Sequence, residues 1–274
     1  MFFLHSWHPQ SVAFTIGNFT VHWYGIYLAL GALAGYWLIS RLARLVNVEE
    51  RHVANLFLWL VPTGLLGGRL YHVTNEWSYY LAHPAEIAKI WSGGLAIHGA
   101  VLAGLLVIWS YARRHHLGFW RLLDIFTPGL ALGQAIGRWG NYFNQELFGG
   151  PTTLPWGIPI EPAFRPSGYE LSAYFHPTFL YESLGLLLTV ILLVWLFWKS
   201  TARQNFWSVP GSIALLYFFL AGLLRIGTEL LRIDRVPILA GIRLPILASL
   251  LIMVAAVIIL IVLHRHHRAP ANHP

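Results

Sequence analysis

The 274-residue sequence contains no cysteine and only two aspartates, Asp124 and Asp234. Without cysteine, the chain cannot form a disulfide framework, a thiolate nucleophile or a thiolate metal site. Two aspartates are too few for the aspartate-rich magnesium site of CDP-alcohol phosphotransferases. The G-x-S-x-G nucleophile elbow is absent as well. So is the H-x-x-x-x-D pair of lipid acyltransferases. These absences exclude several common classes of lipid enzyme.

Charged residues are also scarce, at 11 % of the chain, whereas hydrophobic residues make up 57 % and the mean hydropathy is +0.58. A membrane-spanning helix needs about 20 predominantly apolar residues. The sequence predicts an all-α integral membrane protein with seven transmembrane helices. The seven apolar stretches lie at about 20–40, 53–73, 94–112, 122–143, 178–198, 209–231 and 244–263.

The basic residues predict the orientation. Ten lysines and arginines lie in the connections and tail that would share one side of the membrane, against five on the other. The first forty residues contain none. By the positive-inside rule the N-terminus lies outside and the C-terminus in the cytoplasm.

The absence of lysine and arginine from the first forty residues also argues against a cleaved signal peptide, so the first apolar stretch should remain as a helix. The net charge of +7 suits an anionic membrane surface, and no nucleic-acid-binding motif is present.

The sequence has no internal repeat and no long polar linker, which predicts a single membrane domain over residues 1–274. The substantial non-helical segment, at about 144–177, is rich in proline and glycine and predicts a small ordered extracytoplasmic cap. Glycines also recur at the spacing typical of close helix packing. They are Gly31 and Gly35, Gly64 and Gly68, and Gly129, Gly133 and Gly137.

Polar residues nevertheless occur where the bilayer should exclude them. A charged side chain in the hydrocarbon costs a few kcal/mol or more, and such residues usually face a wet functional cavity. Several helices place them at one depth near the outer side, which predicts one shared cavity. Each pair also has a structural explanation, such as an Arg225–Glu229 ion pair, or Arg138 joined to Glu146 or Glu182. The set comprises His22, Tyr24, Arg69, His72, His98, Arg138, Asn141, Asn144, Glu146, His176, Tyr181, Glu182, Arg225, Glu229, Arg232 and Asp234.

The chemistry of this set indicates a phosphate ligand. Guanidinium groups make bidentate contacts with phosphate and stay charged. Asparagines supply neutral donors and acceptors, His98 can move a proton near neutral pH, and carboxylates can orient the arginines. Inside a bilayer, such a cavity suits an anionic phospholipid headgroup. We expect metal-free chemistry without a cofactor, with phosphate as the leaving group and an external nucleophile.

Six sequence blocks carry a family resemblance. The most specific reads Gly-Arg-x-Gly-Asn-x-x-Asn-x-Glu-x-x-Gly at 137–149. The chain resembles the bacterial prolipoprotein diacylglyceryl transferases over nearly its whole length. The other blocks are His22-Trp23-Tyr24-Gly25, Gly67-Gly68-Arg69, Gly93-Gly94-Leu95-Ala96-Ile97-His98-Gly99, His176-Pro177-Thr178-Phe179-Leu180-Tyr181-Glu182 and Arg225-x-x-x-Glu229-x-x-Arg232-x-Asp234.

The resemblance implies transfer of diacylglycerol from phosphatidylglycerol to the lipobox cysteine of a prolipoprotein signal peptide. The product is a thioether and glycerol 1-phosphate leaves. It also implies a multi-pass protein of the bacterial plasma (inner) membrane, with its active site toward the extracytoplasmic side. We expect catalytic roles for Tyr24, His98, Arg138, Glu146, Arg225 and Glu229. We expect substrate contacts from Arg69, Arg138, Asn141, Asn144, Gly149, His176, Tyr181, Glu182 and Arg225.

Two positions depart from the family pattern. Family members usually carry a tyrosine where this chain has Ala221, and many have a glutamine where it has Ile246. Two alternatives therefore accompany the transferase. One is a phospholipid-headgroup binding or transport protein without covalent chemistry, although transporters often show repeated halves and this chain shows none. The other is a family member that has lost activity, which the retained His98, Arg138 and Arg225 argue against.

Overall fold

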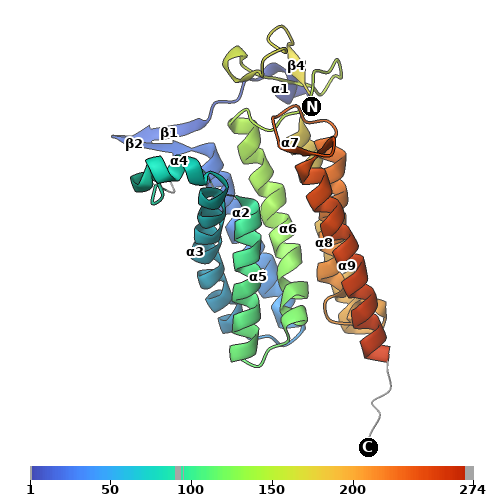
Figure 1. Cartoon of the computed structure of the whole chain (residues 1–274). Coiled ribbons are helices and arrows are strands. Elements are labelled where there is room, and N and C mark those ends of the chain that lie inside the picture. Colours follow the sequence, from blue (N-terminus) through green and yellow to red (C-terminus); the bar gives the residue numbers. More distant parts are fainter. Residues whose placement is uncertain (1, 90–93, 95, 269–274) are drawn as a thin grey trace, which may run out of the picture. The chain divides into compact units, whose positions relative to one another are not determined.

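A computed structural model describes residues 2–89, 94 and 96–268, with only the backbone of residues 2, 3, 97, 98 and 268 (Figure 1). The chain divides into two compact units, Met1–Ile39 with Phe126–Pro274, and Ser40–Ile125. In chain order the helices are α1 (Phe2–Ser6), α2 (Trp23–Leu45), α3 (Glu50–Asn75), α4 (Trp77–Ala82), α5 (Ile97–Arg114), α6 (Phe119–Phe143), α7 (Thr178–Ala202), α8 (Ser212–Glu229) and α9 (Leu244–Arg268). The short strands are β1 (Val12–Ile16), β2 (Phe19–His22), β3 (Ile158–Pro159), β4 (Tyr174–Phe175), β5 (Ile238–Leu239) and β6 (Ile242–Arg243). The described residues also form the 3₁₀ turns η1 (Pro84–Glu86), η3 (Pro162–Phe164) and η4 (Phe206–Ser208).

Within the described residues, five helices are long and apolar enough to cross a membrane, namely α2, α3, α7, α8 and α9. The mostly helical architecture with several candidate spans is therefore confirmed. The predicted spans at 94–112 and 122–143 correspond to α5 and α6, which are not among the five. Helix α6 contains Asp124, Gln134 and Arg138, which lower its hydropathy. The number of seven spans stays a prediction.

Glycines bring α2 and α6 together within the first unit, as their spacing predicts. A Cβ atom at Gly31 would lie 2.7 Å from the carbonyl oxygen of Gly133, and one at Gly35 would lie 2.8 Å from that of Gly129. No larger residue fits either position without displacing backbone. Gly137 differs, because nothing lies within 4 Å of a Cβ atom there. The predicted helix contact therefore includes Gly129 and Gly133 but not Gly137.

The variant Gly31→Ala tests this contact. Its added methyl group would press on the backbone of Gly133, so we expect the free energy of unfolding to fall by about 1–3 kcal/mol, a typical cost of overpacking. Gly227→Ala in α8 is the control, because a Cβ atom there meets nothing within 4 Å. Thermal unfolding in detergent should show a lower midpoint for Gly31→Ala alone. Equal midpoints for the two variants would contradict the contact.

In the first unit, α1 is followed by a β-hairpin that the sequence did not predict. Strands β1 and β2 pair antiparallel, with Ile16 opposite Phe19 and a turn that begins at Gly17, whose φ is 59°. Glycine adopts this left-handed conformation without steric cost. The first long helix consequently starts at Trp23, three residues later than the predicted stretch.

The segment at 144–177, which we call the cap, is ordered around its own small core. Strands β3 and β4 pair with Ile158 opposite Phe175, and both side chains are buried. The His5 ring of α1 stacks on Tyr174 at 3.9 Å and its Nδ1 hydrogen-bonds the carbonyl of Gly157 at 2.8 Å. Figure 1 shows α1 beside the loops of the cap. The cap therefore fixes the chain that enters α7.

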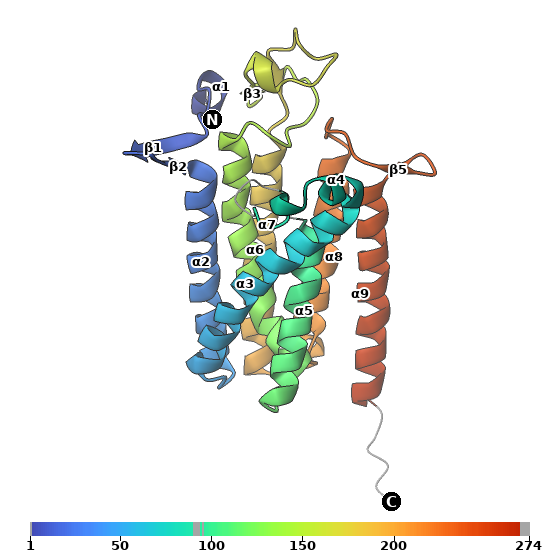
Figure 2. The same ribbon diagram turned by 60° about the vertical axis from the view of Figure 1, so that its left-hand side comes forward.

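The second unit centres on the packing of α3 against α5, which Figure 2 shows side by side. A Cβ atom at Gly67 would lie 2.6 Å from the carbonyl oxygen of Gly99 and 2.5 Å from Cβ of Ala103. Helix α4 and turn η1 follow α3, and the Tyr79 hydroxyl donates a hydrogen bond of 2.8 Å to Glu86 Oε2. This bond lowers the pKa of the exposed Glu86 carboxyl.

Candidate functional site

The signature residues of 137–149 lie at the end of α6 and in the turn that follows it. Gln145 and Leu147 have φ angles of 51° and 56°, in the left-handed region that non-glycine residues rarely adopt. This turn brings the chain back toward the helix. The Asn141 side-chain amide donates to Glu146 Oε1 at 2.8 Å, and that of Asn144 donates to the same oxygen at 3.3 Å. Backbone strain of this kind often accompanies functional sites.

Glu182, in the second turn of α7, forms the centre of an ion-pair network. Its carboxylate is 2.5 Å from Nε of Arg138 on α6, 3.6 Å from Arg225 Nη1 on α8 and 3.0 Å from Arg232 Nη2 beyond α8. The Thr228 hydroxyl donates a further hydrogen bond of 2.7 Å to it. One buried carboxylate therefore holds arginines from three segments.

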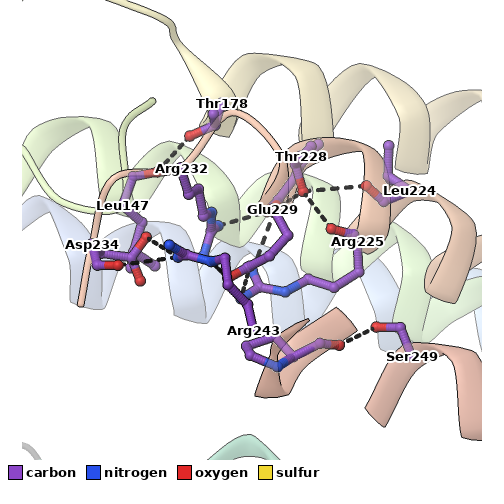
Figure 3. A network of polar contacts seen from close by, with 12 residues as sticks. Leu147, Thr178, Leu224, Arg225, Thr228, Glu229, Arg232, Asp234, Arg243 and Ser249 are labelled. Carbon is purple, nitrogen blue, oxygen red and sulfur yellow. Dashed lines mark hydrogen bonds and ion pairs between the residues drawn. The ribbon is translucent and has the colours of Figure 1, made fainter. Parts of the chain in front are cut away.

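Glu229 is the second shared carboxylate (Figure 3). Its Oε2 lies 2.6 Å from Arg225 Nη2, and its Oε1 accepts a hydrogen bond of 2.8 Å from Nε of Arg243. Arg243 also donates to the carbonyl of Asp234 at 3.0 Å and lies 3.5 Å from its carboxylate. Arginines and carboxylates thus alternate from α6 through α7 and α8 to the start of α9.

Burial separates the four arginines into two kinds. The side chain of Arg232 is 3 % exposed, whereas those of Arg138, Arg225 and Arg243 are 29, 27 and 25 % exposed. Burial lowers the pKa of the Arg232 guanidinium, and the Glu182 carboxylate opposes that effect. Arg232 is therefore an internal counterion for Glu182. The other three can each contact a ligand.

Gly149 and Tyr24 occupy positions set by close packing. A Cβ atom at Gly149 would lie 2.8 Å from Cβ of His176 and 3.0 Å from the carbonyl oxygen of Leu231. The Gly149 N–H donates to the carbonyl of His176 at 2.9 Å. This position has no room for a side chain, so Gly149 joins the cap to the segment after α8. Similarly, the Tyr24 ring packs against Gly140, where a Cβ atom would come within 2.7 Å of it.

His176 and Tyr181 lie together at the start of α7. Nδ1 of His176 is 3.2 Å from the hydroxyl of Tyr181, which accepts a hydrogen bond of 2.8 Å from Trp156 Nε1. These contacts tie the cap to α7. His176 and Tyr181, which the sequence predicted as substrate contacts, therefore hold the cap against the start of α7.

Arg69 belongs to the second unit, where its guanidinium is buried. It donates to the carbonyl groups of Glu86 at 2.5 Å, Ile87 at 2.9 Å and Gly94 at 3.2 Å. It thereby joins α3 to the backbone at these three positions. His98 is the second residue of α5, and its side chain lies outside the described residues.

Sequence reasoning missed three contributors to this site. Arg243 entered only the count of basic residues, although an arginine directly before the last apolar stretch is a usable signal. Thr228 had no signal. Gln145 is buried and connects two distant segments, because its amide donates to the Pro9 carbonyl at 2.9 Å and accepts from the Glu161 N–H at 2.7 Å.

Comparisons with known proteins agree with the resemblance. A family model described as prolipoprotein diacylglyceryl transferase matches residues 11–262. The chain is 45 % identical to a phosphatidylglycerol–prolipoprotein diacylglyceryl transferase of Synechococcus elongatus, over 88 % of this chain and 83 % of that protein. It is 43 % identical to one of Thermosynechococcus vestitus, over 80 % of each chain. It is 42 % identical to one of Finegoldia magna, over 81 % of this chain and 84 % of that protein. The chain belongs to the prolipoprotein diacylglyceryl transferase family.

Proposed function

We propose that the protein transfers the diacylglyceryl group of phosphatidylglycerol to the lipobox cysteine of bacterial prolipoproteins. The observation that carries this proposal is the alternating network in which Arg138 and Arg225 share Glu182 while both remain partly exposed. Two guanidiniums held by one buried carboxylate are preorganised to bind a phosphate. The names of the relatives support the same donor and acceptor.

The reaction is a substitution at carbon. The cysteine sulfur attacks the glycerol carbon of the diacylglyceryl group that is bonded to the phosphate oxygen. A carbon–sulfur bond forms, the carbon–oxygen bond breaks, and its electron pair leaves with glycerol 1-phosphate. Arg138 and Arg225 stabilise the charge on the leaving phosphate. His98 accepts the thiol proton, directly or through water.

The other predicted residues complete the site. Asn141 and Asn144 position Glu146 and offer amide groups to glycerol or phosphate oxygens, and Tyr24 packs beside them at Gly140. Glu229 orients Arg225. Gly149, His176 and Tyr181 hold the cap against this site, and Glu182 holds its arginines. Arg69 donates to the backbone carbonyl groups of Ile87 and Gly94. The reaction requires no metal and no cofactor in this scheme.

The membrane arrangement belongs to the proposal as well. Residues 1–274 form one domain with seven spans, the N-terminus outside, the C-terminus in the cytoplasm and the cap extracytoplasmic. The protein lies in the bacterial inner membrane with its active site toward the outer side. Phosphatidylglycerol reaches the site from the surrounding lipids, and the signal peptide presents its cysteine from the same bilayer.

An assay of glycerol phosphate release tests this function. Purified protein in detergent with phosphatidylglycerol should release glycerol phosphate when a lipobox peptide is added. The same peptide with serine in place of cysteine should give no release. Binding of phosphatidylglycerol without release under either condition would support the headgroup-binding alternative and contradict the transferase.

The variant His98→Asn tests the proton acceptor. Asparagine keeps a polar side chain of similar size but cannot accept a proton, so we expect the transfer rate to fall about 10²–10⁴-fold, as for the loss of a general base. Raising the pH should recover part of the rate, because more of the peptide thiol is then ionised. Full activity of His98→Asn at neutral pH would exclude this role.

A further inference from the structure

Arg243 is positioned by a hairpin that none of the sequence blocks includes. Strands β5 and β6 pair with Ile238 opposite Arg243 and Leu239 opposite Ile242. The turn between them consists of Ala240 and Gly241, whose φ angles are 51° and 78°. Figure 2 shows the hairpin projecting sideways from the connection between the ends of α8 and α9. The tight turn returns the chain, so that Arg243 comes back to Glu229 at the end of α8.

The guanidinium of Arg243 is only partly used by the protein. Nε contacts Glu229 and Nη2 contacts Asp234, whereas Nη1 makes no hydrogen bond or ion pair with any residue that the structure describes. Arginine has five N–H donors in a planar fork. The side chain is also a quarter exposed. Arg243 therefore keeps donors for a ligand, in contrast to the buried Arg232.

The charges of the network leave one positive charge without a counterion. Four arginines, namely Arg138, Arg225, Arg232 and Arg243, form ion pairs with three carboxylates, those of Glu182, Glu229 and Asp234. Glu146 is bonded to two asparagine amides and, within the described residues, pairs with none of these arginines. An uncompensated charge beside the buried ionised groups of Glu182, Glu229 and Arg232 is costly. A ligand with a single negative charge balances it, and the phosphodiester of a phospholipid carries one.

The surroundings of Arg243 indicate that this phosphate belongs to a lipid. The hairpin exposes Ile238 by 67 %, Leu239 by 61 % and Ile242 by 40 %. Contiguous exposed apolar side chains mark a surface that meets a membrane or a partner. In a membrane protein, a short apolar hairpin between two spans meets the lipid. Arg243 thus lies between this apolar turn and the Arg225–Glu229 pair.

We propose that Arg243 is a third arginine that binds the phosphodiester of the lipid donor, together with Arg138 and Arg225. Arg225 and Arg243 contact the two different oxygens of Glu229. Both guanidiniums therefore lie within reach of one further anion of similar size. This inference rests on the proposed function, because it identifies a donor contact for the same reaction.

The variant Arg243→Gln tests the inference. A hydrogen bond to a charged group contributes about 1.5–3 kcal/mol, so we expect the KM for phosphatidylglycerol to rise about tenfold or more. Inhibition by added glycerol 1-phosphate should weaken by a similar factor, while the KM for the lipobox peptide stays unchanged. Arg243→Lys should recover part of the loss, because lysine keeps the charge but not the fork. The matched control is Arg235→Gln, an exposed arginine of the same connection that forms no ion pair among the described residues.

Three outcomes decide the question. A rise in the lipid KM with weaker inhibition by glycerol 1-phosphate, absent in Arg235→Gln, supports the phosphate contact. A lower kcat with an unchanged KM for phosphatidylglycerol and unchanged inhibition by glycerol 1-phosphate would mean that Arg243 only orients Glu229. Equal shifts in Arg235→Gln would mean a general surface-charge effect. Either result overturns the proposal. If the unaltered protein transfers no diacylglyceryl group, the proposed function fails. The dissociation constants of the unaltered protein and of Arg243→Gln for phosphatidylglycerol then still test the contact.

Discussion

Replacing Arg138 with lysine is expected to lower kcat/KM for diacylglyceryl transfer about 10²–10³-fold, a range typical for the loss of one preorganised donor in a transition state. Nε of Arg138 contacts Glu182 at 2.5 Å, and its Nη1 lies 3.4 Å from the side-chain oxygen Oδ1 of Asn141. Lysine keeps the charge but cannot hold Glu182 with one nitrogen and direct others toward a phosphate. The loss should therefore appear mainly in kcat, because the leaving phosphate gains charge as the carbon–oxygen bond breaks.

The control for this result is Arg203→Lys, an exposed arginine just after α7. It should keep the full rate of transfer. The thermal midpoints of both variants should also lie close to that of the unaltered protein, because Glu182 retains two other arginines. An Arg138→Lys protein that is folded and as active as Arg203→Lys would contradict the phosphate role of Arg138.

Replacing Glu182 with glutamine is expected to produce the largest loss of stability. Glu182 is 2 % exposed, and its carboxylate contacts Arg138, Arg225, Arg232 and Thr228. Glutamine has nearly the same shape but no charge, so buried Arg232 would lose its counterion. Removal of one partner from a buried ion pair costs about 3–5 kcal/mol. We expect a much lower thermal midpoint in detergent, or no folded protein.

Two further variants separate charge from packing at this position. Glu76→Gln alters an exposed glutamate at the end of α3 and should leave the midpoint within a few degrees. Thr228→Val removes only the hydroxyl that donates to Glu182, and its thermal midpoint should lie between those of Glu182→Gln and Glu76→Gln. A Glu182→Gln protein as stable as Glu76→Gln would show that the network contributes nothing to the fold.

The sequence predicted the helical membrane architecture and most of the polar cluster because both depend on local patterns. Long apolar stretches locate helices α2, α3, α7, α8 and α9, although α2 begins after an unpredicted hairpin. The i,i+4 spacing predicted the Arg225–Glu229 pair, which is confirmed at 2.6 Å. Glycine spacing predicted close helix packing at Gly31 and Gly35, and the structure places them against Gly133 and Gly129 of α6.

Contacts between distant segments were less predictable. The sequence left two partners open for Arg138, and only the three-dimensional arrangement places Glu182, 44 positions further along the chain, beside it. Arg243 returns to Glu229 only because the Ala240–Gly241 turn reverses the chain. The segment between α8 and α9 shows neither helical nor strand periodicity, so its sequence contained little information about that geometry.

Mass spectrometry of a lipobox peptide tests the central claim most directly. The peptide would be incubated with purified protein and phosphatidylglycerol in detergent. The account predicts a mass gain of one diacylglyceryl group on the cysteine, which is lost with Arg138→Ala and retained with Arg203→Lys. A folded preparation that binds phosphatidylglycerol but adds no mass to the peptide would contradict the account, and Ala221 would then be the first residue to change to tyrosine.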